Sequence, residues 1–324
     1  MQRIVVTGAA GQIGTELTRA LRERYGADAV LATDIRQPEA LDSGPFQAVD
    51  CLRPGSVLDV LRRHRADTLF HLPALLSARS AHDPWRAWEL NVGGLRLALE
   101  AVREAGAAIF VPSSIGAFGP STPKDPTPQD TVQRPTSMYG ITKVAGELLC
   151  DFYADRYGVD ARGLRYPGLV SHTAPAGGGT TDWAVEIFHA AVRDGAYTCF
   201  LEPDTRLDLM YMPDATRAAI ELMEADASRL AHRNAFNITA VSVTPAEMAR
   251  EIRRHLPRFT IDYAVDRDVR QPIAESWPDR LDDSAAREEW GWRPAYDLAA
   301  MVADMLHHLG IGSTEAPRPT ETTR

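Results

Sequence analysis

The chain has 324 residues, of which 44% are hydrophobic and 24% are charged, and its formal net charge is -9 at pH 7. A chain of this length buries a sizeable core in one large or two ordinary domains. The acidic balance argues against nucleic acid or an anionic membrane as a partner, because both are bound through basic patches. No apolar run approaches the ~18 residues of a membrane span, and a strand-like run opens the chain without a targeting segment, so we expect a cytoplasmic protein.

The three cysteines, Cys51, Cys150 and Cys199, are widely separated and form no CxxC pair or Cys/His cluster. We therefore expect neither a disulfide framework nor a metal site. Any redox chemistry must then come from a bound cofactor.

The chain begins with a predicted strand, a glycine turn and a helix. A β-branched apolar run stops at Gly8, and residues 12–25 carry apolar residues at helical spacing. Missing side chains at Gly8 and Gly11 allow a tight turn and the close approach of a pyrophosphate, whose charge is met by free N–H groups at the helix start. Gly14 lets that helix lie close to the sheet.

A second strand-like run ends at Asp34, twenty residues after Gly14. An acid at this distance accepts hydrogen bonds from an adenosine ribose and repels a 2′-phosphate, so the pattern favours NAD over NADP. Arg36 stands nearby and would soften that preference. Glycine triads alone are weak signals, but this one has the strand, the helix and the acid in their expected places.

Strand and helix patterns continue to alternate. One strand ends at Asp50, a position suited to the adenine amino group, and a buried strand follows at residues 67–72. We expect His71 to be a core histidine, because no Cys, His or acid clusters with it. Residues 73–77 should then pass over the cofactor at the C-terminal edge of the sheet, where α/β proteins bind ligands.

Two long amphipathic helices are predicted, over residues 84–106 and 137–158, the second capped by Ser137. Asn91 lies inside the first helix, where Asn is neutral at best. Its side chain is either solvated or makes a polar contact beneath the cofactor loop, and the sequence leaves both open. The two helices are more apolar than one sheet face requires, which predicts a homodimer through a helix bundle.

The intervening strand delivers Ser113 and Ser114 at its end, and the second helix carries Tyr139 and Lys143. Residues four apart share a helix face, so the phenol and the ammonium should lie side by side. A nearby cation lowers the pKa of a phenol from its usual ~10. Such a pair removes a proton from an alcohol while a serine hydroxyl holds the substrate oxygen. Either motif alone is commonly structural.

Beyond residue 170 the alternation is interrupted. Residues 175–182 contain three successive glycines and two threonines before a helix predicted over 183–193. A flexible linker is one interpretation. The alternative is a substrate lid, in which N–H groups at the helix start favour an anion, a carboxylate included.

These patterns predict an α/β fold, a doubly wound parallel sheet of the Rossmann type with a smaller C-terminal α/β domain. We expect residues 1–170 to bind NAD, with a later strand near 207–240 returning to the same sheet. Residues 171–312 should form mainly the substrate domain and lid. The Thr-, Pro- and Glu-rich tail over 313–324 should be disordered.

Taken together, the motifs resemble an extended short-chain dehydrogenase/reductase, the group that includes nucleotide-sugar epimerases, over about residues 1–310. The late Trp-Gly-Trp-x-Pro signature at 290–294 belongs to this resemblance. Three further stretches, 112–120, 164–171 and 177–188, closely resemble the short-chain type L-threonine 3-dehydrogenases. The resemblance implies NAD-dependent oxidation of the β-hydroxyl of L-threonine to 2-amino-3-oxobutanoate.

The same resemblance assigns roles to residues. Tyr139 would be the base, Lys143 would bind the nicotinamide ribose and lower the pKa of Tyr139, and Ser114 would orient the substrate alcohol. Pro73 stands where many relatives carry a smaller residue. The implied cofactor-binding residues are Gly8, Gly11, Gln12, Ile13, Gly14, Asp34, Ile35, Asp50, Cys51, Leu72, Pro73, Ala74, Asn91, Ser113, Tyr139, Lys143, Tyr166 and Pro167. The implied substrate residues are Ser77, Ser114, Tyr139, Gly178, Gly179, Thr180 and Thr181.

Two other functions stay open. A nucleotide-sugar epimerase or dehydratase would share the chain as far as Lys143, but such enzymes commonly carry Asn where Gly168 stands. They also need cationic groups for a diphosphate, and residues 172–200 hold no obvious basic cluster. A non-enzymatic NAD-sensing regulator often loses the Tyr/Lys pair, which this chain keeps.

Overall fold

The computed structural model describes residues 1–37, 44–173 and 177–311. The expected disordered tail lies outside these residues, as do residues 175 and 176 of the glycine-rich loop. A seven-stranded sheet of order β10-β6-β5-β4-β1-β2-β3 forms the centre, and every neighbouring pair in it is parallel. Its strands are β1 (Ile4–Thr7), β2 (Val30–Asp34), β3 (Phe46–Ala48), β4 (Thr68–His71), β5 (Ala108–Ser114), β6 (Ala161–Tyr166) and β10 (Phe236–Asn237).

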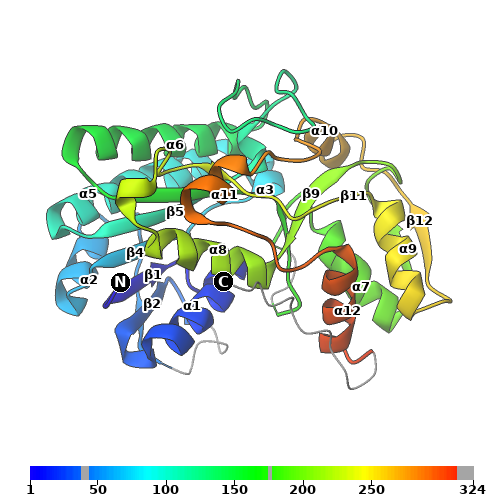
Figure 1. Ribbon diagram of the computed structural model, residues 1–324, viewed down its shortest axis with the longest axis horizontal. Helices are drawn as coiled ribbons and strands as arrows, with labels where there is room; N and C mark the ends of the chain where they lie inside the picture. The colour runs from blue at the N-terminus through cyan, green and yellow to red at the C-terminus, as the bar shows by residue number, and fades with distance from the viewer. Residues whose placement is uncertain (38–43, 174–176, 312–324) are drawn as a thin grey trace.

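Helices cover both faces of this sheet (Figure 1). Val5 lies in one apolar core and its neighbours Ile4 and Val6 lie in the other, so the strands bury both faces and read as unbroken apolar runs. One face carries α2 (Ser56–His64), α5 (Leu95–Ala105) and α6 (Met138–Tyr157), and the other carries α1 (Gln12–Tyr25) and α8 (Met212–Glu224). The predicted doubly wound fold is confirmed.

The strand order reverses at β1, which lies between β2 and β4. At such a point the loops that follow β1 and β4 diverge and leave a crevice at the carboxyl edge of the sheet. The loops still meet at its base, since a Cβ on Gly8 would lie 2.8 Å from the nitrogen of Pro73. Pro73 therefore contacts the glycine turn directly.

The first predicted long helix has the expected extent but not a uniform geometry. It runs as α4 (Pro84–Trp88), a π-helical turn over Glu89–Gly94 and then α5. Turns of this kind often occur at functional sites, and this one holds Asn91. The short helix α3 (Ser77–His82) precedes it and was not predicted.

A second, smaller lobe packs around its own core, which includes Trp183, Phe188 and Leu209. The pairing of β10 with β6 returns part of the later chain to the main sheet, and the domain division at residue 170 stays a prediction. The lobe contains the three-stranded sheet β11-β9-β7, formed by β7 (Gly168–Val170), β9 (Leu207–Tyr211) and β11 (Val241–Val243), and the parallel pair β8 (Ala196–Cys199) and β12 (Thr260–Tyr263). Its helices are α7 (Trp183–Arg193), α9 (Pro245–His255), α10 (Arg270–Glu275) and α12 (Leu298–His308), and α11 (Ser284–Trp290) lies against the main sheet.

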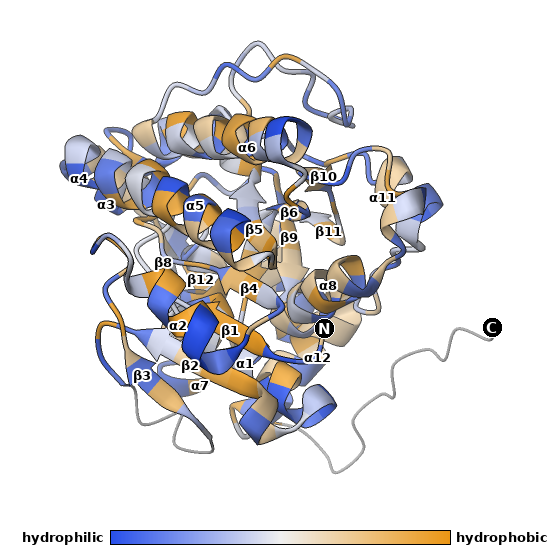
Figure 2. Ribbon diagram, turned by 90° about the vertical axis from the view of Figure 1, so that its left-hand side faces the viewer, coloured by the Kyte–Doolittle hydropathy of each residue, from blue (hydrophilic) through white to orange (hydrophobic). Residues whose placement is uncertain are grey.

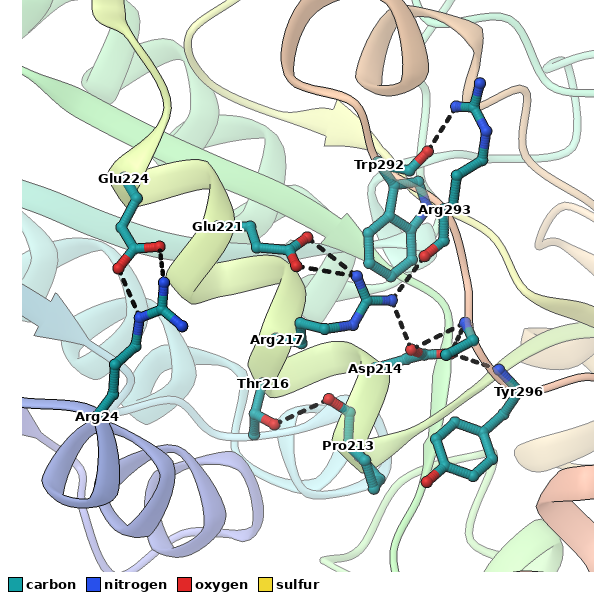
Figure 3. A network of polar contacts seen from close by, with 11 residues as sticks. Arg24, Pro213, Asp214, Thr216, Arg217, Glu221, Glu224, Trp292, Arg293 and Tyr296 are labelled. Atoms are coloured by element: carbon teal, nitrogen blue, oxygen red, sulfur yellow. Dashed lines mark hydrogen bonds and ion pairs between the residues drawn. The ribbon is translucent and has the colours of Figure 1, made fainter. Parts of the chain in front are cut away.

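The late tryptophan signature is fastened to α8 by a polar network (Figure 3). The buried Asp214 carboxylate accepts hydrogen bonds from the nitrogens of Ala295 and Tyr296, at 2.9 and 3.0 Å. Arg217 forms an ion pair with Asp214 at 2.7 Å, and its guanidinium lies 4.8 Å from the centroid of the Trp292 ring. The signature therefore docks the C-terminal segment onto α8, which covers the main sheet. Among the described helices, none combines the length and the apolar character that crossing a bilayer requires.

Candidate active site

A cavity opens at the carboxyl edge of the main sheet, between the two lobes. It brings together residues that the sequence predicts for the cofactor, for the substrate and for catalysis. These are Gln12, Ile13, Leu72, Ala74, Ser77, Ser113, Ser114, Tyr139, Lys143, Tyr166, Pro167, Gly179, Thr180 and Thr181. The sequence analysis did not assign a role in the site to the other lining residues, Leu76, Pro112, Ile115, Gly168, Leu169, Asp182 and Trp277.

Tyr139 is positioned by tight packing at the start of α6. Ser137 caps the helix as predicted, accepting a hydrogen bond from the nitrogen of Gly140 at 3.1 Å. A Cβ on Gly140 would lie 2.2 Å from the carbonyl oxygen of Gly116, so only glycine lets α6 come this close to the turn after β5. That turn begins at Ser114, and the approach puts the Tyr139 and Ser114 side chains in one cavity wall.

Burial controls the protonation of the Tyr139 and Lys143 pair. Desolvation raises the pKa of Tyr139, and a hydrogen bond with Ser114 opposes that rise with a smaller effect. Desolvation also lowers the pKa of Lys143 to about 8. The pKa of Tyr139 is thus raised in this structure, and the predicted lowering by Lys143 stays a prediction. The Lys143 ammonium donates to the Pro112 carbonyl at 2.7 Å and lies 5.5 Å from the centroid of the tyrosine ring.

The glycine-rich loop closes one side of the cavity. The nitrogen of Thr180 donates to the Ser77 hydroxyl at 3.1 Å, and the two hydroxyl oxygens lie 3.2 Å apart. Both residues are buried. Thr181 packs over Gly168, where a Cβ would lie 2.6 Å from its methyl group. The loop is thus joined to the segment after β4 and to the start of β7.

The N–H groups of this loop were predicted to be free to bind an anion. In the structure, two of them are already hydrogen-bonded. The Asp182 carboxylate accepts hydrogen bonds from the nitrogens of Gly178 and Gly179, at 2.8 and 2.9 Å. It occupies the donors that were predicted to meet an external anion. Burial raises the pKa of Asp182, and these two backbone bonds oppose the rise. The first acidic residue after the glycines therefore competes for their N–H groups, which the loop pattern alone did not reveal.

The glycine turn fits a dinucleotide. Gly8 has a φ of +72°, and a Cβ on Gly14 would lie 2.2 Å from the Gly8 carbonyl oxygen. No side chain caps the start of α1, which begins after Gly11, so its first N–H groups face the crevice in the way that binds a pyrophosphate. Asp34 accepts a hydrogen bond from the nitrogen of Ala10 at 3.0 Å, which holds the acid against the turn.

Beyond Asp34, the candidates at the adenosine end lie outside the central cavity. Ile35 is 65% exposed. Asp50 is also exposed, and its carboxylate accepts from the nitrogen of Leu52 at 2.9 Å. Cys51 is buried in the core beneath α2 and α5, and burial raises the pKa of its thiol to about 11. Its side chain packs in the core, so only its main chain is available to a cofactor.

Three predicted cofactor residues use their polar groups to hold the cavity wall. The Asn91 amide bonds both the nitrogen and the oxygen of Leu75, and it donates to the Thr142 hydroxyl at 3.0 Å. The interpretation of Asn91 as a contact beneath the cofactor loop is therefore right, and the solvated alternative is wrong. The Ser113 hydroxyl donates to the buried Glu147, and the Tyr166 hydroxyl donates to the carbonyl of Ala215 at 2.7 Å.

His71 is a core histidine, as predicted. It is 3% exposed, its Nδ1 lies 2.9 Å from the Thr7 hydroxyl, and burial lowers its pKa to about 3. Trp277 is a lining residue that no sequence signal identified, because it reaches the cavity from a loop after α10.

Comparison with known proteins agrees with this geometry. Residues 4–239 match the NAD dependent epimerase/dehydratase family. An uncharacterized epimerase/dehydratase of Staphylococcus haemolyticus is 54% identical over 94% of this chain and 97% of its own length. The fold and motifs are thus shared over nearly the whole of both chains.

Several similar solved structures are L-threonine dehydrogenases. The enzyme from Clostridium difficile superposes with a TM-score of 0.94 at 48% identity, over 96% of this chain and 99% of that one. The holo form of the enzyme from Cupriavidus necator gives 0.92 at 49% identity, over 95% and 99%. A monomeric L-threonine 3-dehydrogenase from a metagenome gives 0.91 at 41% identity, over 94% and 98%.

The glycine turn and the central cavity fit a nicotinamide dinucleotide, the strand order is that of a Rossmann sheet, and the family match covers most of the chain. This chain therefore belongs to the NAD-dependent epimerase/dehydratase family, whose extended short-chain dehydrogenase/reductase fold it shares.

Proposed function

We propose that this protein is an L-threonine 3-dehydrogenase that uses NAD as the hydride acceptor and produces 2-amino-3-oxobutanoate. The observation that carries the proposal is that Thr180 and Thr181 of the glycine-rich loop line the same cavity as Tyr139 and Ser114. A small amino acid is the substrate class that suits these hydroxyl groups, which can bind its polar backbone groups. The bound nicotinamide supplies the acceptor for the β-hydrogen.

Gly168 supports threonine over a nucleotide sugar. A side chain here would overlap Thr181, with a Cβ lying 2.9 Å from the Cβ of that residue. The Asn that epimerases commonly carry at this place would displace the threonine from the cavity wall. The solved L-threonine dehydrogenases that match at 48% and 49% identity support the same substrate.

The residues divide the work of the reaction. The Tyr139 oxygen, once ionised, takes the proton of the β-hydroxyl, and the Ser114 hydroxyl holds the same substrate oxygen. Lys143 would bind the nicotinamide ribose and, as a cation, favour the phenolate. Thr180 and Thr181 would hold the amino-acid backbone through their hydroxyl groups, which turns the β-carbon toward the nicotinamide.

We also propose that the chain forms a homodimer. Six large apolar side chains are 40% to 75% exposed on α4 and α6, which pack against each other on one side of the molecule (Figure 2). They are Trp85, Trp88, Ile141, Leu148, Phe152 and Tyr157. Soluble monomers rarely leave such a continuous apolar face in water.

One assay separates the substrates. NADH absorbance is followed with L-threonine, L-serine or a UDP-hexose as the sole substrate, and we expect turnover with L-threonine. A UDP-hexose that is converted while L-threonine is not would contradict the proposal and leave the family assignment intact.

A variant tests the base. Tyr139→Phe removes only the oxygen that accepts the proton, so turnover should fall by at least about 10²-fold. Binding of NAD, followed by fluorescence titration, should be retained. A variant that kept most of its rate would show that another group is the base.

A further inference from the structure

A cluster of two imidazoles and a carboxylate lies on the molecule away from the Tyr139 cavity. His172 comes from the segment after β7, and Asp304 and His308 lie one turn apart on α12. One ligand atom from each of the three lies within 4.8 Å of the other two. His172 is more than 130 positions from Asp304 and His308 in the chain, which is why the cluster was not predicted from the sequence.

The hydrogen bonds around the cluster fix both imidazole tautomers. The Tyr211 hydroxyl has one proton, which it donates to Asp304 at 2.7 Å. Nδ1 of His172 lies 2.8 Å from the same hydroxyl, so it must be the donor in that contact. Nδ1 of His308 lies 2.9 Å from the backbone carbonyl oxygen of Asp304, an acceptor only, and is therefore also protonated.

Each ring thus carries its lone pair on Nε2. This is the arrangement that metal-binding histidines adopt, in which the second ring nitrogen donates to a carboxylate, a carbonyl or a hydroxyl and so orients the ligand. The two rings are stacked, with centroids 3.8 Å apart and planes 19° from parallel. Two neutral imidazoles tolerate this contact, whereas two imidazolium ions would repel.

The charges around the cluster also suit a cation. Two acidic groups, Asp304 and the buried Glu16, interact electrostatically with the imidazoles of the cluster. The exposed Arg19 is the nearby positive group that opposes them. His308 is 43% exposed, so an ion has access from solvent. Ligand atoms within 4.8 Å of one another can meet one ion at ~2.1 Å after small side-chain movements.

We propose that His172, Asp304 and His308 form a binding site for a divalent first-row transition ion, with Zn²⁺ as the type that matches two imidazoles and a carboxylate. The donor set excludes Ca²⁺ and Mg²⁺ as preferred occupants, because these ions take oxygen ligands. A bound ion would join α12 to the segment that leads from β7 into the glycine-rich loop. The inference does not rest on the proposed substrate.

The test uses the full chain without an affinity tag, stripped with a chelator. Titration calorimetry with ZnCl₂ should give one site per chain, and Co²⁺ should give visible bands of a nitrogen- and oxygen-ligated ion. His308→Ala and His172→Ala should each weaken binding by more than about tenfold, and Tyr211→Phe should weaken it by about 10- to 100-fold. Zn²⁺ should raise the Tm of the wild type and not that of His308→Ala.

His307→Ala is the matched control. His307 is exposed on the same turn of α12, with its ring 5.6 Å from that of His308, and it is outside the cluster. This variant should bind one ion as the wild type does. The three cysteines are buried and do not compete for the metal. Binding that persists unchanged in His308→Ala and His172→Ala, or no binding by the wild type at millimolar Zn²⁺, would overturn the proposal.

Discussion

At the scale of single residues, burial acts on Tyr139 and Lys143 in ways that determine the pH dependence of catalysis. The pKa of Tyr139 is raised, so the phenolate that we propose as the proton acceptor becomes populated only as the pH increases. The pKa of Lys143 is lowered to about 8, so the pair begins to lose a proton near that pH. Because the two groups are adjacent, the proton lost first belongs to the pair rather than to either residue.

We therefore expect kcat/KM for L-threonine to rise with pH and to keep rising through about pH 8, measured between roughly pH 6 and 10. In Lys143→Met the rise should move to higher pH, because no cation remains to favour the phenolate. A wild-type profile that falls across this range would contradict the role of Tyr139 as a base.

Asp182 supports the glycine-rich loop through two bonds to backbone nitrogens. Bonds from such donors to a charged acceptor contribute about 1.5–3 kcal/mol each, so Asp182→Ala should disorder the loop. We expect KM for L-threonine to rise at least about tenfold, equivalent to ~1.4 kcal/mol, while the KM for NAD changes little.

Asp182→Asn is the control for this effect, because its amide oxygen still accepts from both nitrogens. It should keep most of the affinity for L-threonine in steady-state measurements. If Asp182→Ala left that KM unchanged, the loop would not depend on this carboxylate.

The motifs that the sequence revealed are those whose residues lie close together along the chain. Gly8, Gly11 and Gly14 act within one turn, and Tyr139 and Lys143 lie on one face of one helix. Side chains that meet only through tertiary packing gave no comparable signal. Trp277 reaches the cavity from a distant loop, and His172 meets His308 across the fold.

At the scale of secondary structure elements, one buried ion pair joins three parts of the main lobe. Arg165 on β6 binds Glu147 on α6 at 2.8 Å, and both side chains are less than 10% exposed. Arg165 also donates to the carbonyl of Gln129 in the excursion before α6, at 2.8 Å. Its guanidinium lies 5.0 Å from the centroid of the Phe118 ring. Arg165 is thus a common partner of β6, α6 and the excursion that precedes α6.

Arg165→Met leaves the Glu147 carboxylate buried without its cation. We expect the free energy of unfolding in urea to fall by about 3–5 kcal/mol. Arg24→Met is the matched control, since Arg24 pairs with Glu224 on the surface with 55% of its side chain exposed (Figure 3). That change should cost about 1 kcal/mol or less. Equal effects of the two substitutions would contradict the importance of the buried pair.

Long elements were predicted well because their patterns extend over many residues. The helix over residues 12–25 and the helix over 183–193 have the predicted bounds. The strands β7, β8 and β11 have only three or four residues each and were not predicted. Such short strands carry too few side chains for a periodicity, and their pairing partners decide their conformation.

At the scale of the whole molecule, two lobes with separate cores meet at the carboxyl edge of the main sheet, and the cavity lies where they meet. The chain crosses between the lobes more than once, since β10 and α11 return to the main sheet after β9 has entered the second one. The doubly wound parallel sheet was predictable from the alternation of patterns, and β10 returns to that sheet, as expected of a strand near 207–240, through a pairing of two residues.

The exposed apolar face on α4 and α6 gives the last prediction. Ile141, Leu148 and Phe152 are spaced by seven and four residues, so they lie on one side of α6. We expect the wild-type protein to elute at twice the chain mass in size-exclusion chromatography with light scattering.

A charge in the centre of this face must be buried without a partner in the dimer, so the double variant Leu148→Glu/Phe152→Glu should elute as a monomer. Val132→Glu, at a residue that is 52% exposed outside these helices, should remain dimeric. A wild-type chain that is monomeric at micromolar concentration would contradict the interface, and it would then resemble the monomeric metagenomic enzyme in its assembly.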